Sequence, residues 1–469
     1  MNIDYFLIMK SEMVLTVIIF LLLFLKVWDG IKSNTTLLHL VNFLLIINLV
    51  AGFFFNMNGD LFNGMFQTND TIAIEKSILN LGTLIISLTA FDWLKDHKHL
   101  LEFYILLLCT LLGMYFMISS GNLLMFYLGL ELSSIPLAAL CNFDLHKLKS
   151  SESAVKMILS SAFASCILLF GISMLYGTTG TLDFKEMAPL LGHSKLSILA
   201  FIFAFTGFAF KLSAVPFHLW TADVYEGAPV PVTAYLSVIS KGSIVFIFIT
   251  ALSKLFITYQ PTWYNMLYLT ILLTITVGNL FAIRQDNIKR FLAFSSIAQV
   301  GYILLGISSG TPLGTTSAIF FLIVYTFSNL GAFGVVSLVS EKTGKENISD
   351  YKGFNANNKF SSWVMAICLF SLAGIPPTAG FFGKMFLVTA GAAKGNYWLI
   401  GIAVMNMVIS LFYYLRIIKA IFIDENQTPM AKLTGSLSLR LALVICIIGA
   451  VTMGFASGVF DYITTITLK

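Results

Sequence analysis

The sequence predicts an all-α polytopic membrane protein with about fourteen transmembrane helices. Hydrophobic residues make up 58% of the 469 residues, charged residues only 11%, and the mean hydropathy is +0.88. A soluble domain carries roughly a quarter charged residues, so this composition excludes one. The apolar runs are long and lack period-two alternation. They therefore predict helices, each needing roughly 20 apolar residues to cross the lipid with its backbone fully bonded.

The individual helices are delimited by polar residues, glycine or proline that interrupt the apolar sequence. The weakest boundary is Ser-Ser-Gly at 119–121, which we interpret as a tight turn between two helices; one long span is the alternative. The predicted runs are 11–28, 36–57, 72–92, 101–119, 122–142, 153–176, 196–227, 231–257, 264–283, 288–308, 312–340, 360–394, 397–423 and 437–466.

The basic residues of the predicted loops fall into two unequal sets, which predicts the orientation. The smaller set is Lys10, Lys76, Lys185, Lys195, Lys254, Lys394 and Lys469. The larger set is Lys26, Lys32, Lys95, Lys98, Lys147, Lys149, Arg284, Lys289, Arg290, Lys342, Lys345, Lys352, Lys359, Arg416, Lys419, Lys432 and Arg440. The larger set is expected to face the cytoplasm, so both termini face out. The first run has no Ala-x-Ala-like cleavage site and is expected to remain as a helix.

A few ionisable residues lie too far from any predicted loop to reach water. These residues are Glu131, Lys211, Lys241 and Lys384, with Lys156 and His218 as borderline cases. A charge at mid-bilayer costs about 2.5–3.5 kcal/mol and usually faces a bundle interior or a wet cavity. Three lysines cannot all pair with one glutamate, and a buried unpaired lysine can exchange its proton near neutral pH. The pattern therefore indicates proton carriers; buried ion pairs that only fix helix packing are the alternative.

Prolines predict that helices 7 and 12 are broken. Pro216 follows Lys211, and Pro376 and Pro377 precede Lys384; each proline lacks an amide hydrogen and crowds the preceding turn. Broken helices at membrane depth are typical of inverted-repeat transporters, although a simple proline kink is the alternative. Span order then predicts an N-terminal three-helix segment, a first repeat of helices 4–8, an inverted second repeat of helices 9–13 and a final helix. The corresponding residues are 1–95, 96–258, 259–425 and 426–469, with Lys211 and Lys384 as pseudo-equivalent positions.

The sequence has no local motif for a cofactor. It contains no GxxxxGK[ST], no GxGxxG after a strand, no HExxH and no cysteine cluster, so nucleotide, flavin, zinc and iron–sulfur sites are not expected in this chain. The net charge of +5 reflects the asymmetry of the loops and indicates no nucleic-acid partner.

Four stretches carry a resemblance to a known family. They are GLELSSIPL at 129–137, FKLSAVPFHLWTADVYEGAPVPVTAYLSVISKGS at 210–243, IKRFLAFSSIAQVGY at 288–302 and LAGIPPTAGFFGKMFLV at 372–388. The chain resembles the N subunits of bacterial respiratory complex I (NADH:quinone oxidoreductase), which are related to multisubunit cation/proton antiporters. Lys384 stands where an M-type subunit is expected to carry glutamate, which favours the N type.

The resemblance implies a proton path through the middle of the membrane. In this sequence Glu131 would pair with Lys211, Lys241 would be the central relay, and Lys384 the terminal residue. The positions of Lys156 and His218 match further polar positions of the family. Relatives often carry histidine where this chain has Gln299, which cannot take up a proton at physiological pH.

The resemblance also implies a setting. The chain is expected in the bacterial inner membrane, beside M-type and K-type subunits and the lateral helix of the L-type subunit, within the lipid bilayer. NADH, flavin, iron–sulfur clusters and quinone are expected in partner subunits. Proton movement coupled to quinone reduction is the predicted function. The alternatives are a subunit of a cation/proton antiporter, a structural membrane scaffold and a small-solute transporter.

Overall fold

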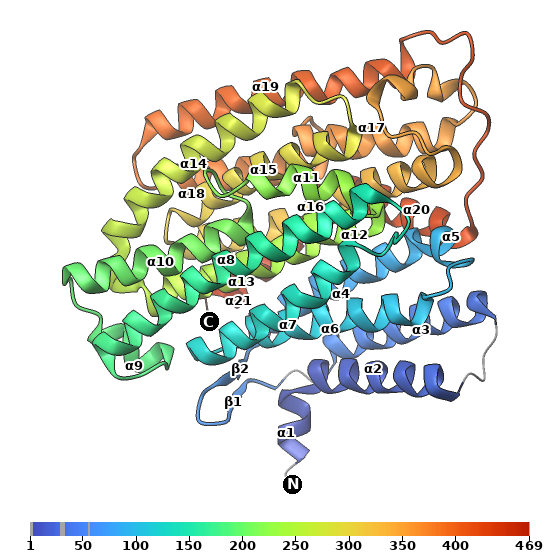
Figure 1. The fold of residues 1–469 in the computed structure, drawn as a ribbon. Coiled ribbons are helices and arrows are strands. Elements are labelled where there is room, and N and C mark those ends of the chain that lie inside the picture. Colours follow the sequence, from blue (N-terminus) through green and yellow to red (C-terminus); the bar gives the residue numbers. More distant parts are fainter. Residues whose placement is uncertain (1–2, 29–32, 55–56, 469) are drawn as a thin grey trace.

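The computed structural model describes residues 3–28, 33–54 and 57–468, and these form a bundle of roughly parallel and antiparallel helices (Figure 1). The helices are α1 (Ile3–Ile8), α2 (Lys10–Trp28), α3 (Asn34–Phe53), α4 (Asp70–Thr89), α5 (Phe91–Leu94), α6 (Leu100–Ile118), α7 (Leu123–Cys141), α8 (Leu148–Thr179), α9 (Phe184–Leu190), α10 (Lys195–Leu212), α11 (Leu219–Gly227), α12 (Val230–Tyr235), α13 (Lys241–Thr250), α14 (Gln260–Ile283), α15 (Ile288–Ile307), α16 (Pro312–Thr343), α17 (Lys359–Ala373), α18 (Ala379–Ala392), α19 (Tyr397–Phe422), α20 (Leu437–Thr452) and α21 (Ser457–Thr467). Two π-helical turns, Leu236–Ser240 and Ala251–Leu255, join and extend α12 and α13, and 3-10 turns occupy Ile257–Tyr259, Ile348–Tyr351 and Phe354–Ala356.

The prediction of a helical membrane protein is confirmed. Each of the fourteen predicted runs coincides with a helix or with consecutive helices. Within the described ranges, 12 helices are long and apolar enough to cross a membrane, or 13 if the bent pair α20 and α21 is one span. Helices α17 and α18 are each shorter than a crossing helix and together fill the run 360–394. The weak boundary is also settled, because α6 ends at Ile118 and α7 begins at Leu123.

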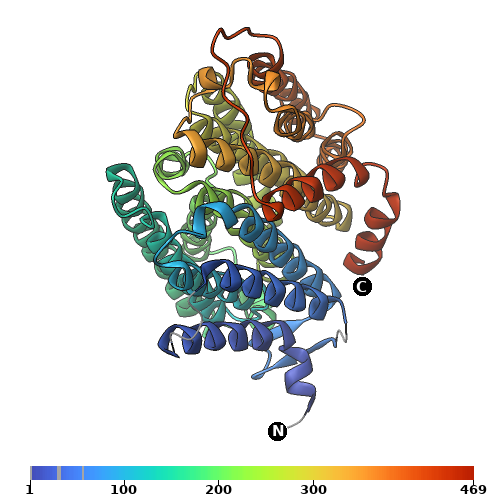
Figure 2. The ribbon, with the colours of Figure 1, turned by 90° about the vertical axis from the view of Figure 1, so that its right-hand side faces the viewer.

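The centre of the bundle is formed by α15 and α16. The apolar window of α16 is 100% buried and that of α15 is 94% buried, whereas that of α2 is only 28% buried. Helix α20, the last but one, packs against both α16 and α4, so a C-terminal segment lies against the first hundred residues (Figure 2). A hydrogen bond from the Ser436 amide to Asp92 Oδ2, 2.8 Å long, fixes this closure.

Both predicted breaks are present. Helix α10 ends at Leu212 and α11 begins at Leu219, and the peptide bond between Val215 and Pro216 is cis. Helix α17 ends at Ala373 and α18 begins at Ala379, around a cis Pro376–Pro377 bond. Lys211 lies before its break and Lys384 after its break, so these lysines do not hold matching places along the two broken helices.

A third break was not predicted. The run 437–466 was expected to be one helix, but α20 and α21 meet at an angle of 80°. A Cβ added at Gly454, in the bend, would lie 3.2 Å from the backbone of Ala379 and from the carbonyl oxygen of Pro377. The chain therefore bends where it packs against the α17–α18 break, a contact between distant segments that local sequence does not reveal.

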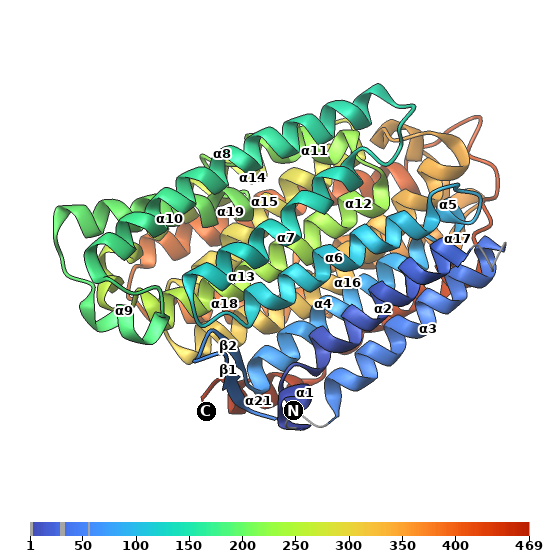
Figure 3. The ribbon, with the colours of Figure 1, turned by 60° about the horizontal axis from the view of Figure 1, so that its bottom comes forward.

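The all-α prediction also misses a short β-hairpin. Strands β1 (Gly59–Leu61) and β2 (Phe66–Thr68) pair antiparallel, with Leu61 opposite Phe66. The turn has three consecutive residues with positive φ, Phe62, Asn63 and Gly64. This hairpin, α9 and both ends of the described chain lie on one face of the bundle (Figure 3).

Replacing Gly380 with alanine is expected to destabilise the α17–α18 break. A Cβ at Gly380 would lie 1.8 Å from the carbonyl oxygen of Ser371, so backbone must move. Overpacking of this kind costs about 1–3 kcal/mol. The measurement is the thermal midpoint of the detergent-solubilised protein. Gly401→Ala on α19 is the control, since nothing lies within 4 Å of the added carbon; equal midpoints for the two variants would contradict the prediction.

Candidate functional site

The three lysines predicted at membrane depth are all buried. Lys211 is 8% exposed, Lys241 3% and Lys384 3%. Lys211 lies in the last turn of α10, Lys241 begins α13, and Lys384 lies in the middle of α18. Among the residues that the structure describes, no carboxylate forms an ion pair with any of the three.

Lys211 is held by hydroxyl groups rather than by a carboxylate. Its Nζ donates hydrogen bonds to Ser134 Oγ on α7 and Ser161 Oγ on α8, each 2.7 Å long. Ser134 in turn donates to the carbonyl oxygen of Leu130, so its oxygen is free to accept from the lysine.

Glu131 and Lys211 form no direct ion pair in the described part of the chain, so their pairing stays a prediction. Oε1 of Glu131 is buried and has no hydrogen-bond partner in the described part of the chain. Ser134 follows Glu131 by three residues on the same helix and takes its place as the partner of Lys211. The carboxylate is nevertheless on the helix that binds the lysine, one turn away.

Lys241 lies directly after a π-helical turn. Its Nζ donates to Ser296 Oγ on α15 at 2.7 Å and lies 5.4 Å from the ring centre of Tyr225 on α11. A π-helical turn adds a residue to one turn and so changes which face the following side chains occupy; such turns are frequent at functional sites. Here it precedes the lysine that faces α11 and α15.

Lys384 binds the end of the broken helix before it. Its Nζ donates to the carbonyl oxygens of Leu372 at 2.7 Å and Ala373 at 3.2 Å, and lies 5.0 Å from the ring centre of Tyr302. The last carbonyl groups of a helix have no intrahelical partner and carry partial negative charge. The break after Ala373 therefore supplies the acceptors for this buried cation.

One face of α15 joins the surroundings of Lys241 and Lys384. Ser296, Gln299 and Tyr302 follow one another at intervals of three residues, which places them on one side of the helix. Gln299 Nε2 donates to the Leu372 carbonyl oxygen, the same atom that accepts from Lys384, and to the hydroxyl of Tyr414, both at 3.0 Å. Gln299 thus lies beside Lys384.

The two borderline residues differ. His218 is 8% exposed, and its Nδ1 is buried without a hydrogen-bond partner among the described residues. Lys156 is far more exposed: 41% of its side chain is accessible, and it forms ion pairs with Glu152 at 2.6 Å and Asp223 at 2.7 Å.

Lys156 belongs to a charged network that the sequence analysis missed. Arg290 joins Asp223 at 2.6 Å and Glu226 at 3.0 Å, and Lys149 binds Glu226 at 2.9 Å. The acids lie in α11, the second half of a broken helix. The signal that could have found them was the spacing of Asp223 and Glu226, three residues apart on one helix face.

Other buried charges were missed as well. Lys76 on α4 pairs with Glu12 on α2 at 2.6 Å, and their side chains are only 4% and 1% exposed. Glu75 is 3% exposed, and Lys289 is 4% exposed and pairs with Glu346 at 3.0 Å. Glu131 is therefore not the only deep carboxylate, and the sequence analysis placed Lys76 and Lys289 too near the loops.

Comparisons with known proteins give consistent matches. A family model described as NADH:quinone oxidoreductase/Mrp antiporter, transmembrane, matches residues 120–410. The chain is 45% identical to NADH-quinone oxidoreductase subunit N of Phocaeicola vulgatus over 99% of both chains, and 47% identical to that of Azobacteroides pseudotrichonymphae over 94% of this chain and 92% of the relative. It is similar to a chain of respiratory complex I from Thermus thermophilus, with a TM-score of 0.82 and 26% identity, over 96% of this chain and 97% of that one.

Proposed function

This chain belongs to the subunit N family of NADH-quinone oxidoreductase, and from that premise we propose that it moves protons across the membrane through its buried lysines. In this proposal Glu131 and Lys211 begin the path, Lys241 is its centre and Lys384 its end. Reduction of quinone in another part of the complex drives the movement. This chain contributes no redox chemistry of its own.

The observation that carries the proposal is the set of partners around the lysines. Lys211, Lys241 and Lys384 are bound by hydroxyl and carbonyl oxygens, which accept a hydrogen bond from the charged ammonium without cancelling its charge. Lys76 is buried to the same extent but is paired with Glu12. A lysine retained for packing alone would be expected to have a counter-charge, because an uncompensated buried charge is strongly destabilising.

The separated Glu131 and Lys211 give the path a point of control. Two unit charges 4 Å apart attract by about 4 kcal/mol at an effective dielectric constant of 20. Movement of Glu131 toward Lys211 would hold the proton on the lysine, and movement away would release it toward Lys241. In this structure the two groups are apart, and Lys211 donates its hydrogen bonds to Ser134 and Ser161 instead.

The setting proposed for the chain follows its family. It lies in the bacterial inner membrane beside M-type and K-type subunits and the lateral helix of the L-type subunit. NADH, flavin, iron–sulfur clusters and quinone bind to other subunits. The distribution of basic residues supports an orientation with both termini on the outer side.

The test is NADH-driven proton uptake by inverted membrane vesicles that carry Lys211→Ala. We expect uptake to fall by roughly tenfold, equivalent to a barrier about 1.4 kcal/mol higher, because the first lysine of the path is gone. NADH oxidation and the amount of assembled complex are measured in the same vesicles. Lys419→Ala, at a side chain that is 63% exposed, is the control. Unchanged uptake in an assembled Lys211→Ala complex would favour a scaffold.

A further inference from the structure

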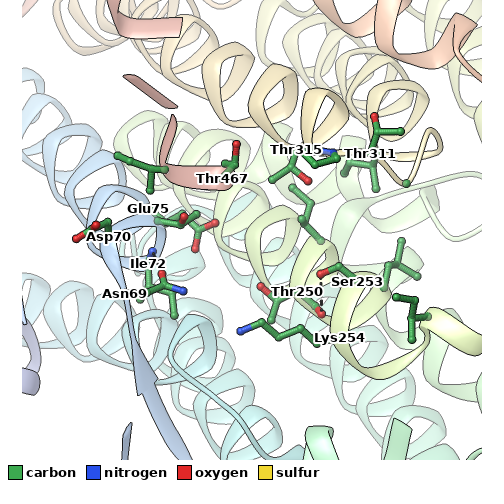
Figure 4. A pocket seen from close by; sticks show the side chains of 18 of the residues that line it. Asn69, Asp70, Ile72, Glu75, Thr250, Ser253, Lys254, Thr311, Thr315 and Thr467 are labelled. Carbon is green, nitrogen blue, oxygen red and sulfur yellow. Dashed lines mark hydrogen bonds between the residues drawn. The ribbon is translucent and has the colours of Figure 1, made fainter. Parts of the chain in front are cut away.

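A cavity of about 650 Å³ lies on the face of the bundle that carries both ends of the described chain. Its walls are the first turns of α4 and α16, the π-helical turn after α13, the start of α14 and the end of α21. Most of its polar lining can hydrogen-bond water, through hydroxyl and amide groups (Figure 4). These residues are Asn58, Asn69, Thr71, Thr250, Ser253, Gln260, Thr311, Thr315 and Thr467.

Glu75 is the buried carboxylate of this cavity. It is 3% exposed, it lines the cavity, and its Oε2 is buried without a hydrogen-bond partner in the described part of the chain. The neighbouring Lys76 is committed to Glu12 on the other side of α4, at 2.6 Å. A buried carboxylate without a partner is costly, so the free oxygen calls for an occupant from the cavity.

The scarcity of ligands around Glu75 favours a proton over a metal cation as that occupant. Lys254 reaches into the cavity from the opposite wall, where its positive charge opposes any added cation, a proton included (Figure 4). The other charged groups near Glu75 are Lys76, Glu12 and, at the rim, Asp70. The lining residues from α16 and α21 are uncharged. Across the described residues no three acidic, histidine or cysteine side chains gather as metal ligands would.

Glu75 is separate from the row of lysines. Lys241 faces Ser296 on α15, whereas the next residue, Gly242, faces Leu79 on α4. The cavity reaches the same helix at Ile249, eight residues or about 12 Å beyond Lys241 at 1.5 Å per residue. Glu75, on α4, therefore lines a cavity that reaches one end of the span Val230–Leu255, whose middle carries Lys241.

We infer that this cavity is a water-filled vestibule open to the outer solution, in which Glu75 binds a proton and releases it outside. The role as an exit rests on the proposed function and on the proposed orientation, but the exchange of a proton at Glu75 does not.

The first test measures access and protonation directly in the whole complex. A carbodiimide that cannot cross membranes reacts with a protonated carboxyl group: the proton moves to a carbodiimide nitrogen while the carboxyl oxygen bonds to the central carbon. We expect Glu75 to be labelled in right-side-out vesicles, increasingly as the outer pH falls, and not in inverted vesicles. Mass spectrometry of the peptide detects the adduct, which Glu75→Gln must abolish.

A second variant tests whether reagents from outside reach the cavity at all, which decides what an unlabelled Glu75 means. Ser253→Cys, in the cavity wall, is treated with a small membrane-impermeant thiol reagent. If Cys at 253 reacts from outside but Glu75 is never labelled, the carboxylate does not bind a proton; if neither reacts, no open vestibule exists. Either result overturns the inference.

Proton uptake by inverted vesicles that carry the same variants separates this inference from the proposed function. Glu75→Gln is expected to lower uptake and flatten its dependence on the pH at the outer face, while Asp60→Asn, on the exposed strand β1 outside the cavity, leaves both unchanged. If Glu75 is labelled but the lysine variants pump normally, the proposed function fails and the proton site stands. If the lysine variants fail but Glu75 is never labelled, only this inference fails.

Discussion

Lys241→Met in the assembled complex is expected to slow NADH-driven proton uptake by roughly a hundredfold, equivalent to a barrier about 2.7 kcal/mol higher. Lys241 binds Ser296, on the face of α15 whose Gln299 lies beside Lys384. The hydroxyl group of Ser296 does not release its proton near neutral pH, so it cannot replace the lysine. Beyond it, Gln299 has no titratable group. Uptake is followed by quenching of a pH-sensitive dye in inverted vesicles, alongside NADH oxidation.

Lys241→Arg distinguishes a relay from a scaffold. A guanidinium group remains charged, so it preserves the buried cation but cannot release a proton. A proton path predicts nearly the same loss as with methionine, whereas inert packing charges predict that arginine restores uptake. Lys147→Met, at a side chain 70% exposed, is the surface control. Normal uptake in Lys241→Met would remove Lys241 from the path.

The second large effect is expected on stability. Lys76→Met leaves the Glu12 carboxylate buried without its partner, which costs about 3–5 kcal/mol. Lys76 Nζ also lies 5.1 Å from the ring centre of Phe66, a contact that the methionine cannot replace electrostatically. We expect a lower thermal midpoint of the solubilised complex and less assembled protein in the membrane. The measurement is a heating series analysed by size-exclusion chromatography.

The matched variant removes both charges at once. Glu12→Leu combined with Lys76→Met is expected to recover most of the midpoint, because replacing a whole buried ion pair by apolar groups is often neutral. A midpoint equally low in the double variant would show that shape, not the unpaired charge, is the cause.

The features that the sequence predicts well are those fixed within one segment. Lys241 and Lys384 could be predicted as buried because each lies far from the predicted loops on either side of its own helix. The prolines locate both helix breaks to within a few residues. Composition and run length are enough for the helices themselves, since the lipid requires them.

Features that depend on how distant helices are rotated against each other could not be predicted. Whether Lys211 meets Glu131 or Ser161 is decided by the packing of α7, α8 and α10, and the pairing of Glu12 with Lys76 joins residues 64 positions apart. The bend at Gly454 likewise reflects a close approach to Ala379. Periodicity gives the face of a helix but not the neighbour that the face meets.

The Leu372 carbonyl oxygen, which accepts from both Lys384 and Gln299, links chemistry to mechanics. Thermodynamic coupling is reciprocal. A movement of the end of α17 that weakens or strengthens this contact changes the proton affinity of Lys384. Deprotonation of Lys384 changes the equilibrium position of α17 by the same free energy. The bend between α20 and α21 touches that break through Gly454. A partner subunit that shifts α20 and α21 would therefore change the proton affinity of Lys384. Release of the proton from Lys384 would in turn change the preferred position of these helices against the partner.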